Sequence, residues 1–237
     1  MKLRNKNLKI LKSNHVYSEE MEHDACGVGL VASTEGLKSR KVVEYGIDAL
    51  KAVWHRGAID ADGKTGDGAG IHIEIPKDFF EEKIEVTGHK HDNSELCVGM
   101  IFLPRNDYSA QEQCRTIVES ELTKRNFSIY GWRQVPVDPS VLGEKAEQTR
   151  PEITQVLFTY NDKKVVNKSL EQKLYETRRV IEKEALNNQL NNFYICSFSS
   201  KSIIYKGMFL AEALSDFYTD LKDCLLYTSP SPRDSGQ

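Results

Sequence analysis

Residues 23–32 read HDACGVGLVA, and the interpretation of the whole chain depends on this stretch. A polar, acidic run ends at Asp24, and the first apolar segment begins at Cys26. Cys26 is either a small core residue at the head of a buried strand over residues 26–33, or a thiol that becomes residue one after cleavage. A thiol attacks a carbonyl well only as a thiolate, and an N-terminal cysteine carries its own base in the α-amine. The local sequence favours the structural interpretation and leaves the other open.

The composition is that of an ordinary globular chain. Of the 237 residues, 39% are hydrophobic and 28% are charged, and the formal net charge is −3. This net charge is not the excess of Lys and Arg that nucleic-acid binding requires. No apolar run reaches the ~18 residues that span a membrane. Lys and Asn interrupt residues 1–14 too often for the apolar core of a secretion signal, so we expect a cytoplasmic protein.

The five cysteines predict neither a zinc site nor a disulfide framework, because none forms a CxxC pair and their number is odd. Cys97 and Cys196 lie in the apolar runs LCVGMIF and FYICSF and are predicted to be inert core thiols. His89 and His91 lie in a polar turn and are predicted to be exposed. We expect no metal site.

The hydrophobic periodicity predicts an α+β fold. Ser39 is a plausible N-cap for the first helix, and capping-box spacing at Ser109 and Ser169 predicts the start of the next two. Helices are expected over residues 39–55, 109–122, 169–186 and 208–218, and strands over 26–33, 71–75, 96–104, 127–138, 154–160, 193–199 and 202–207.

A glycine-rich loop covers residues 56–70, RGAIDADGKTGDGAG. Its GKT at 63–65 suggests a phosphate-binding loop, but five residues instead of four separate Gly57 from Gly63, and a strand follows rather than a helix. Arg56 lies where the preceding helix ends. Its guanidinium could hold a carboxylate or the loop backbone, or it could simply complement the helix dipole. The sequence alone supports both roles equally.

Four blocks together resemble one family. They are HDACGVGLVA (23–32), HRGAIDADGKTGDGAGIHIEIP (55–76), GWRQVPVD (131–138) and YICSFSSKSIIYKGMFLAEALSDFYTDL (194–221). In this order they resemble the start of the large subunit of bacterial-type glutamate synthases, which is a class II glutamine amidotransferase domain. The resemblance covers residues 22–223.

The resemblance implies an N-terminal-nucleophile (Ntn) hydrolase fold, an αββα sandwich, here incomplete at its C-terminus. Residues 1–25 would be a propeptide, and residues 26–223 a partial amidotransferase domain. Cys26 would be the catalytic nucleophile that hydrolyses glutamine through a thioester. The residues expected to bind substrate or order the site are Arg56, Gly27, Gly66, Asp67 and Gly68.

The resemblance also implies partners outside this chain. Ammonia from glutamine would reach a synthase domain that holds FMN and an iron–sulfur cluster and converts 2-oxoglutarate to glutamate. We expect no cofactor within this chain. An NADPH-oxidising small subunit or ferredoxin would supply electrons, and the sequence does not decide between them.

Residues 224–237 do not continue the pattern. CLLYTSPSPRD resembles the translation of a sequencing-library adapter, so we expect a non-native tail after Asp223. The chain has no Asn-Gly pair, which the family uses to stabilise the oxyanion, so the polypeptide itself is expected to be inactive. The alternative is a non-catalytic binding module that keeps the fold. A nucleotide-binding protein would be a third class, against which the loop spacing already argues.

Overall fold

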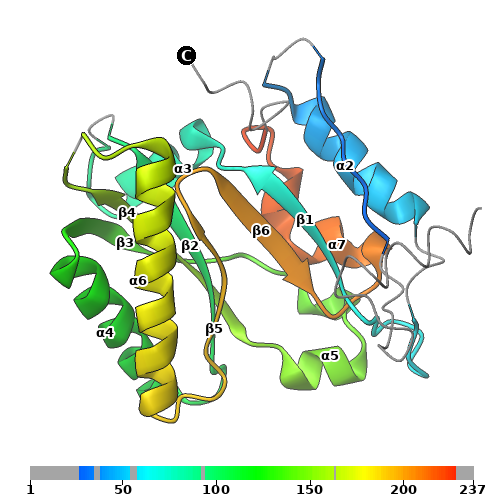
Figure 1. Cartoon of the computed structure of the whole chain (residues 1–237). Helices are drawn as coiled ribbons and strands as arrows, with labels where there is room; N and C mark the ends of the chain where they lie inside the picture. The colour runs from blue at the N-terminus through cyan, green and yellow to red at the C-terminus, as the bar shows by residue number, and fades with distance from the viewer. Residues whose placement is uncertain (1–26, 35–37, 54–57, 92–93, 163, 228–237) are drawn as a thin grey trace, which may run out of the picture.

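A computed structural model describes residues 27–34, 38–53, 58–91, 94–162 and 164–227, and the predicted α+β class is confirmed (Figure 1). The helices are α2 (Arg40–Ala52), α3 (Lys77–Val86), α4 (Tyr108–Lys124), α5 (Glu144–Thr149), α6 (Asn167–Asn187) and α7 (Leu214–Phe217). Short 3₁₀ turns are η2 (Pro139–Val141), η3 (Ala211–Ala213) and η4 (Thr219–Lys222). The strands are β1 (Ala69–Glu74), β2 (Leu96–Leu103), β3 (Phe127–Gln134), β4 (Glu152–Tyr160), β5 (Tyr194–Ser199) and β6 (Ser202–Gly207).

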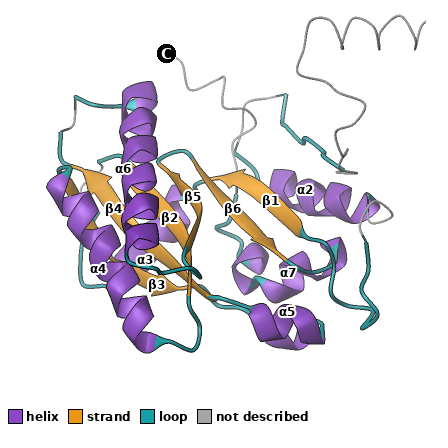
Figure 2. Ribbon diagram, turned by 60° about the horizontal axis from the view of Figure 1, so that its bottom comes forward, coloured by secondary structure: helices purple, strands orange, loops and turns teal. Residues whose placement is uncertain are grey.

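The larger sheet has four antiparallel strands in the order β3-β4-β2-β5. Because successive side chains point to opposite faces, β2 supplies two cores. Cys97, Ile101 and Leu103 pack under α4 and α6, whereas Val98 and Met100 belong to the core on the opposite side. Figure 2 shows α4 and α6 lying together over one face of this sheet.

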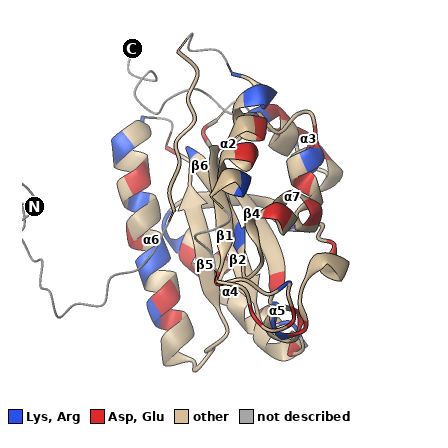
Figure 3. Ribbon diagram, turned by 90° about the vertical axis from the view of Figure 1, so that its right-hand side faces the viewer, with Lys and Arg blue, Asp and Glu red and all other residues tan. Residues whose placement is uncertain are grey.

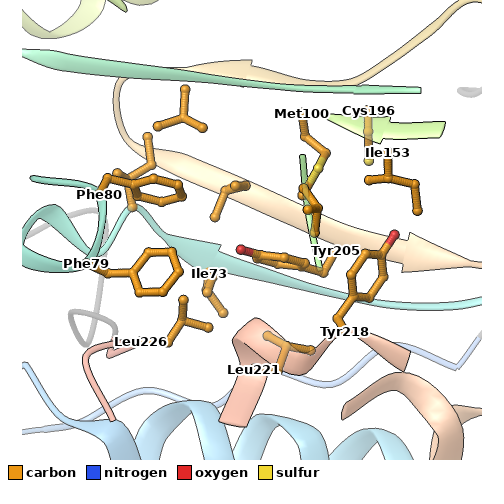
Figure 4. Close-up of a cluster of buried hydrophobic side chains, with 14 of the residues drawn as sticks. Ile73, Phe79, Phe80, Met100, Ile153, Cys196, Tyr205, Tyr218, Leu221 and Leu226 are labelled. Carbon is orange, nitrogen blue, oxygen red and sulfur yellow. The ribbon is translucent and has the colours of Figure 1, made fainter. Parts of the chain in front are cut away.

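The smaller sheet pairs β1 with β6, from Ala69 opposite Gly207 to Glu74 opposite Ser202. Its inward side chains, which include Ile73 and Tyr205, pack in the inner core shown in Figure 4. Helix α2 and the α7 region lie on the far side, so helices, four-stranded sheet, two-stranded sheet and helices succeed one another (Figure 1). This is the layering that the expected sandwich requires.

The outer surface of α6 carries both signs of charge, which is typical of a solvent-facing helix. Glu182 accepts from Arg178 Nε at 2.8 Å and also from Arg179. Figure 3 shows basic and acidic residues alternating along this helix. Among the described residues, no helix is long and apolar enough to cross a membrane.

Helix starts were predicted with mixed success. The first helix begins after Ser39 as expected, with the Ser39 side chain accepting from Lys41 N. The capping boxes at Ser109 and Ser169 were wrong, because both residues lie inside their helices. Asp107 caps α4 by accepting from Ala110 N at 2.9 Å, and α6 begins after Val166 without a side-chain cap.

The predicted strand over residues 26–33 was also wrong in its described part. Gly27–Ser33 enters no β-ladder of the described chain, and Val28 and Leu30 are 91% and 92% exposed. The segment runs beside α2 (Figure 1), where a Cβ on Gly29 would lie 3.9 Å from Ala49 Cβ. An apolar run forms a strand only where another strand offers its backbone groups, and here a helix lies beside it instead.

Two other predicted elements differ in extent. The strand expected over 127–138, which the sequence itself interrupts at Gly131 and Pro136, ends at Gln134, ahead of Pro136, whose ring cannot donate a ladder hydrogen bond. The helix expected over 208–218 is divided into η3 and α7.

Candidate functional site

The predicted site residues fall into three groups. Cys26 and Arg56 lie outside the described residues. Gly27 begins the exposed segment that follows Cys26. Gly66, Asp67 and Gly68 lie together in the loop that leads into β1. The structure therefore gathers three of the predicted residues into one loop and places Gly27 on a different segment.

This loop, residues 58–68, is closed by its own backbone and is called the glycine loop below. Ile59 pairs with Gly66 in an antiparallel bridge. Asp60 N donates to Thr65 O at 2.9 Å, and Asp67 N donates to Ala58 O at 3.3 Å. The loop is thus a defined turn rather than a flexible connection, and both of its ends are tied together.

Gly66 is buried where the glycine loop meets the chain after β6. A Cβ on Gly66 would lie 2.8 Å from Phe209 O and 3.1 Å from Leu210 N, closer than real side chains approach backbone. Only glycine permits this contact. Gly68 has φ of +129°, which an L side chain rarely adopts. The resemblance pointed to these two glycines, and the structure gives each a steric reason.

Asp62 holds the turn of the glycine loop together. Its Oδ1 accepts from Lys64 N at 2.9 Å and Thr65 N at 2.7 Å, and its Oδ2 accepts from Thr65 Oγ1 at 2.5 Å. The hydroxyl of Thr65, followed by the two backbone N–H groups, holds the pKa of Asp62 well below its usual value. Asp62 was not among the predicted site residues, although an Asp three residues before Thr in a glycine-rich turn is a recognisable signal.

The glycine loop is also tied to α5. Lys145 Nζ donates to Asp60 Oδ2 at 2.6 Å. This hydrogen bond is the largest cause of the lowered pKa of Asp60 and the raised pKa of Lys145. A Cβ on Gly143, the N-cap of α5, would lie 2.3 Å from Thr65 Oγ1, so the two segments are in close contact.

We expect Asp62→Ala to loosen the glycine loop. The folded pKa of Asp62 lies below its ordinary value of 3.8, so its contribution is present at neutral pH and is lost as the pH falls below that value. Hydrogen exchange of peptides covering residues 58–70 should accelerate at pH 7 in the variant. The control is Asp48→Ala on the exposed side of α2. Equal exchange in both variants would show that Asp62 does not order the loop.

The described cysteines narrow the choice of nucleophile. Burial raises the pKa of Cys97 well above its usual value, and it raises the pKa of Cys114 and of Cys196 to about 11. Thiols of this kind are protonated at neutral pH and enclosed by the core, so they cannot attack a substrate. The prediction that Cys97 and Cys196 are inert is confirmed. Cys224 is exposed.

The histidines were predicted with partial success. His89 is exposed, as expected, but the side chain of His91 is only 7% exposed, so that prediction was wrong. His91 Nδ1 lies 3.0 Å from Glu81 Oε1, and its ring packs edge-on against Tyr130. Packing against an aromatic neighbour overrides the polar composition of the turn. Among the described residues, no group of three or more His, Cys, Asp and Glu could hold a metal ion.

Comparison with known proteins gives the same family as the sequence blocks. Residues 26–230 match the family described as class-II glutamine amidotransferases. The chain is 55% identical over 217 residues to the glutamate synthase [NADPH] large chain of Azospirillum brasilense, covering 92% of this chain and 14% of that one. It is 38% identical over 203 residues to ferredoxin-dependent glutamate synthase 2 of Synechocystis, covering 85% and 13%.

These relatives are much longer than the chain, which spans about one seventh of the length of each, 14% and 13%. The family match begins at Cys26 and extends to residue 230, past the expected boundary at Asp223. The expected boundaries at residues 25 and 223 stay predictions. The match covers most of the sequence, and the chain belongs to the class II glutamine amidotransferase family.

Proposed function

We propose that this chain supplies the glutamine-hydrolysing domain of a glutamate synthase, with Cys26 as its nucleophile. One observation carries the proposal: the family match begins at Cys26, the cysteine that follows the expected leader. The described core cysteines support it by elimination, since burial raises the pKa of Cys97, Cys114 and Cys196.

In the proposed reaction, removal of residues 1–25 frees the α-amine of Cys26. The thiolate attacks the side-chain amide carbon of glutamine, while the α-amine accepts the thiol proton and delivers it to the departing nitrogen. Ammonia leaves and a γ-glutamyl thioester remains. Water then attacks the thioester with the α-amine as base, which releases glutamate and restores the thiol.

The other predicted residues are assigned supporting roles. Arg56, two residues before the glycine loop begins, would order the site. Gly66 and Gly68 would let the loop backbone approach the substrate, with Asp67 between them and Gly27 directly after the nucleophile. The close packing of Gly66 against Phe209 supports the assignment, because it fixes the loop in one place.

The synthase context is part of the same proposal. Ammonia would pass to a domain outside this chain that binds FMN and an iron–sulfur cluster and forms glutamate from 2-oxoglutarate. The 55% identity is to a relative named for NADPH, whereas relatives named for ferredoxin are 37–39% identical, which favours an NADPH-oxidising small subunit over ferredoxin. A cytoplasmic location belongs to this proposal.

Processing and labelling of the full-length protein test the proposal together. Its intact mass should lack residues 1–25, and a glutamine-analogue diazo ketone should label Cys26 with loss of glutamine hydrolysis. A protein that keeps residues 1–25 and is not labelled would instead be the non-catalytic binding module. The 237-residue polypeptide alone, which has no Asn-Gly pair, should show no hydrolysis under the same assay.

A further inference from the structure

A buried ion pair joins the third and fourth sequence blocks. Arg133 of β3 donates to both carboxylate oxygens of Asp220 in η4, at 2.8 and 2.6 Å, and also to Gln155 Oε1 at 2.8 Å. The two charged side chains are only 14% and 4% exposed. The guanidinium lies over the ring of Phe79, 5.3 Å from its centre. This is a largely buried, bidentate charge pair at the inner core.

A β-bulge in β3 precedes Arg133. Ile129 lies opposite Phe158 and Gly131 opposite Leu157, so Tyr130 is an extra residue in the strand. Gly131 has φ of +156°, which favours glycine at this position. A bulge of this kind shifts the register by one residue, and in a strand such a shift moves every later side chain to the other face.

The bulge directs Arg133 inward. With it, Arg133 lies opposite Gln155 on the inner-core face, and Trp132 points to the α4 side, where its Nε1 donates to Glu119 Oε1 at 2.7 Å. Without it, Arg133 would lie opposite Thr154, on the face covered by α4 and α6. The tripeptide Gly131–Arg133 therefore places a charge where it meets Asp220.

Stability alone is a weak reason for such a pair. Removing two charges from water costs several kcal/mol per ion, and apolar residues of similar size often serve a core equally well. A buried bidentate pair does fix the relative position of the two segments that carry it. Here these segments are the four-stranded sheet and η4, the turn after α7.

Contacts lead from this turn to the glycine loop. Tyr218, two residues before Asp220, donates its hydroxyl to Lys206 O at 2.8 Å and packs edge-on against Tyr205 and Phe209, with ring centres 5.1 and 6.2 Å apart. Phe209 supplies the carbonyl that covers Gly66. The turn that carries Tyr218 and Asp220 is thus in contact with the end of β6 and with Phe209, whose carbonyl is the wall against which Gly66 packs.

The hydroxyl of Tyr205 completes the network. It donates to Asp220 Oδ2 at 3.3 Å and lies 3.4 Å from Gln155 Nε2. Burial, followed by the neighbouring Asp220 carboxylate, raises the pKa of Tyr205 well above its usual value, so the hydroxyl keeps its proton as a donor. Strand β6 is therefore linked to the ion pair through Tyr205, and to the turn that carries Asp220 through Tyr218.

We infer that Arg133 and Asp220 are positioning residues for the amidotransferase site, acting through Tyr218 and Phe209 to hold the glycine loop in place. The catalytic part of this inference rests on the proposed function. The structural part, that a pair without contact to the glycine loop holds it through Tyr218 and Phe209, is argued from these contacts and does not depend on the catalytic assignment.

The test compares two buried carboxylates in the full-length protein. Asp220→Asn removes the charge next to Arg133, and Glu121→Gln removes the 8%-exposed carboxylate that pairs with Arg125 and Lys124 on α4, away from the loop. Asp220→Asn should lower kcat/KM for glutamine at least ~10-fold, since small displacements of a site are costly. It should also accelerate hydrogen exchange over residues 58–70, and Glu121→Gln should do neither.

A third variant separates positioning from folding. Arg133→Met with Asp220→Leu replaces the pair by apolar side chains, which we expect to keep the protein folded. Positioning predicts normal thermal unfolding with fast exchange in the loop and low kcat/KM. Normal exchange over residues 58–70 in both Asp220→Asn and the double variant would overturn the inference. Were the parent protein unable to hydrolyse glutamine, the proposed function would fail, and loop exchange would still decide the role of the pair.

Discussion

Cys26→Ala in the full-length protein is expected to abolish glutamine hydrolysis, with a loss on the order of 10⁴-fold or more. The proposed thioester needs a sulfur nucleophile, and burial raises the pKa of the described core cysteines Cys97, Cys114 and Cys196. Ammonia production from glutamine, followed at saturating substrate, measures the loss. Thermal unfolding should change little, because the described segment that follows Cys26 is exposed and contributes little burial.

Cys114→Ala is the matched control for Cys26→Ala. Cys114 lies on the buried face of α4, where loss of the sulfur leaves a small cavity and costs about 1 kcal/mol. This variant should unfold at a lower temperature and hydrolyse glutamine normally. If glutamine hydrolysis survives Cys26→Ala but is lost in Cys114→Ala, the nucleophile is Cys114 and not Cys26.

Buried strands and amphipathic helices were predictable because their pattern is local. The run Leu96–Leu103 is apolar on both faces, as a central strand between two cores must be, and it forms β2. Helix ends were less predictable. Asp107 and Ser109 are both residue types that favour the N-cap position, and the sequence does not say at which of them the helix will begin.

The segment after Cys26 shows where local patterns fail. Its apolar residues predict a strand, but strand formation depends on a partner that the segment's own sequence does not specify. The ion pair of Arg133 and Asp220 could not be predicted from the sequence for a related reason. The two residues are 87 positions apart, and a bulge at Gly131 reverses the face on which the alternation would place Arg133.

The sequence suggests the residues of the proposed site, and that assignment stays a prediction, whereas it does not suggest the contacts that support the glycine loop. Cys26, Arg56 and the glycine loop follow from the four sequence blocks. The contact between Gly66 and the Phe209 carbonyl follows only from the folded chain, whereas the spacing of Asp62 and Thr65 is a local signal for the turn that Asp62 holds. A motif records the residues that approach a substrate, whereas the contacts that hold them are spread over distant segments.

Gly66→Ala is expected to have the second-largest effect, because it tests this support directly. The added methyl would meet the carbonyl of Phe209 at 2.8 Å and its carbon at 2.9 Å, and backbone cannot rotate away as a side chain would. The loop or the chain after β6 must shift. We expect a loss of about 1–3 kcal/mol in the free energy of unfolding from overpacking. We also expect kcat/KM for glutamine to fall ~10²-fold, because the glycine loop is displaced from its contact with Phe209.

Gly63→Ala separates this effect from ordinary strain in the same loop. Gly63 has φ of +68° and open space around its Cβ position, so alanine there costs about 1–2 kcal/mol of backbone strain without displacing Phe209. The two variants should therefore have similar thermal stability and different activity. If both retain kcat/KM once folded, contact between Gly66 and Phe209 has no role in the site. If only Gly66→Ala lowers kcat/KM, the rate depends on the position of the glycine loop rather than on its stability. That result is expected if the contact of Gly66 with the Phe209 carbonyl sets the position of the loop.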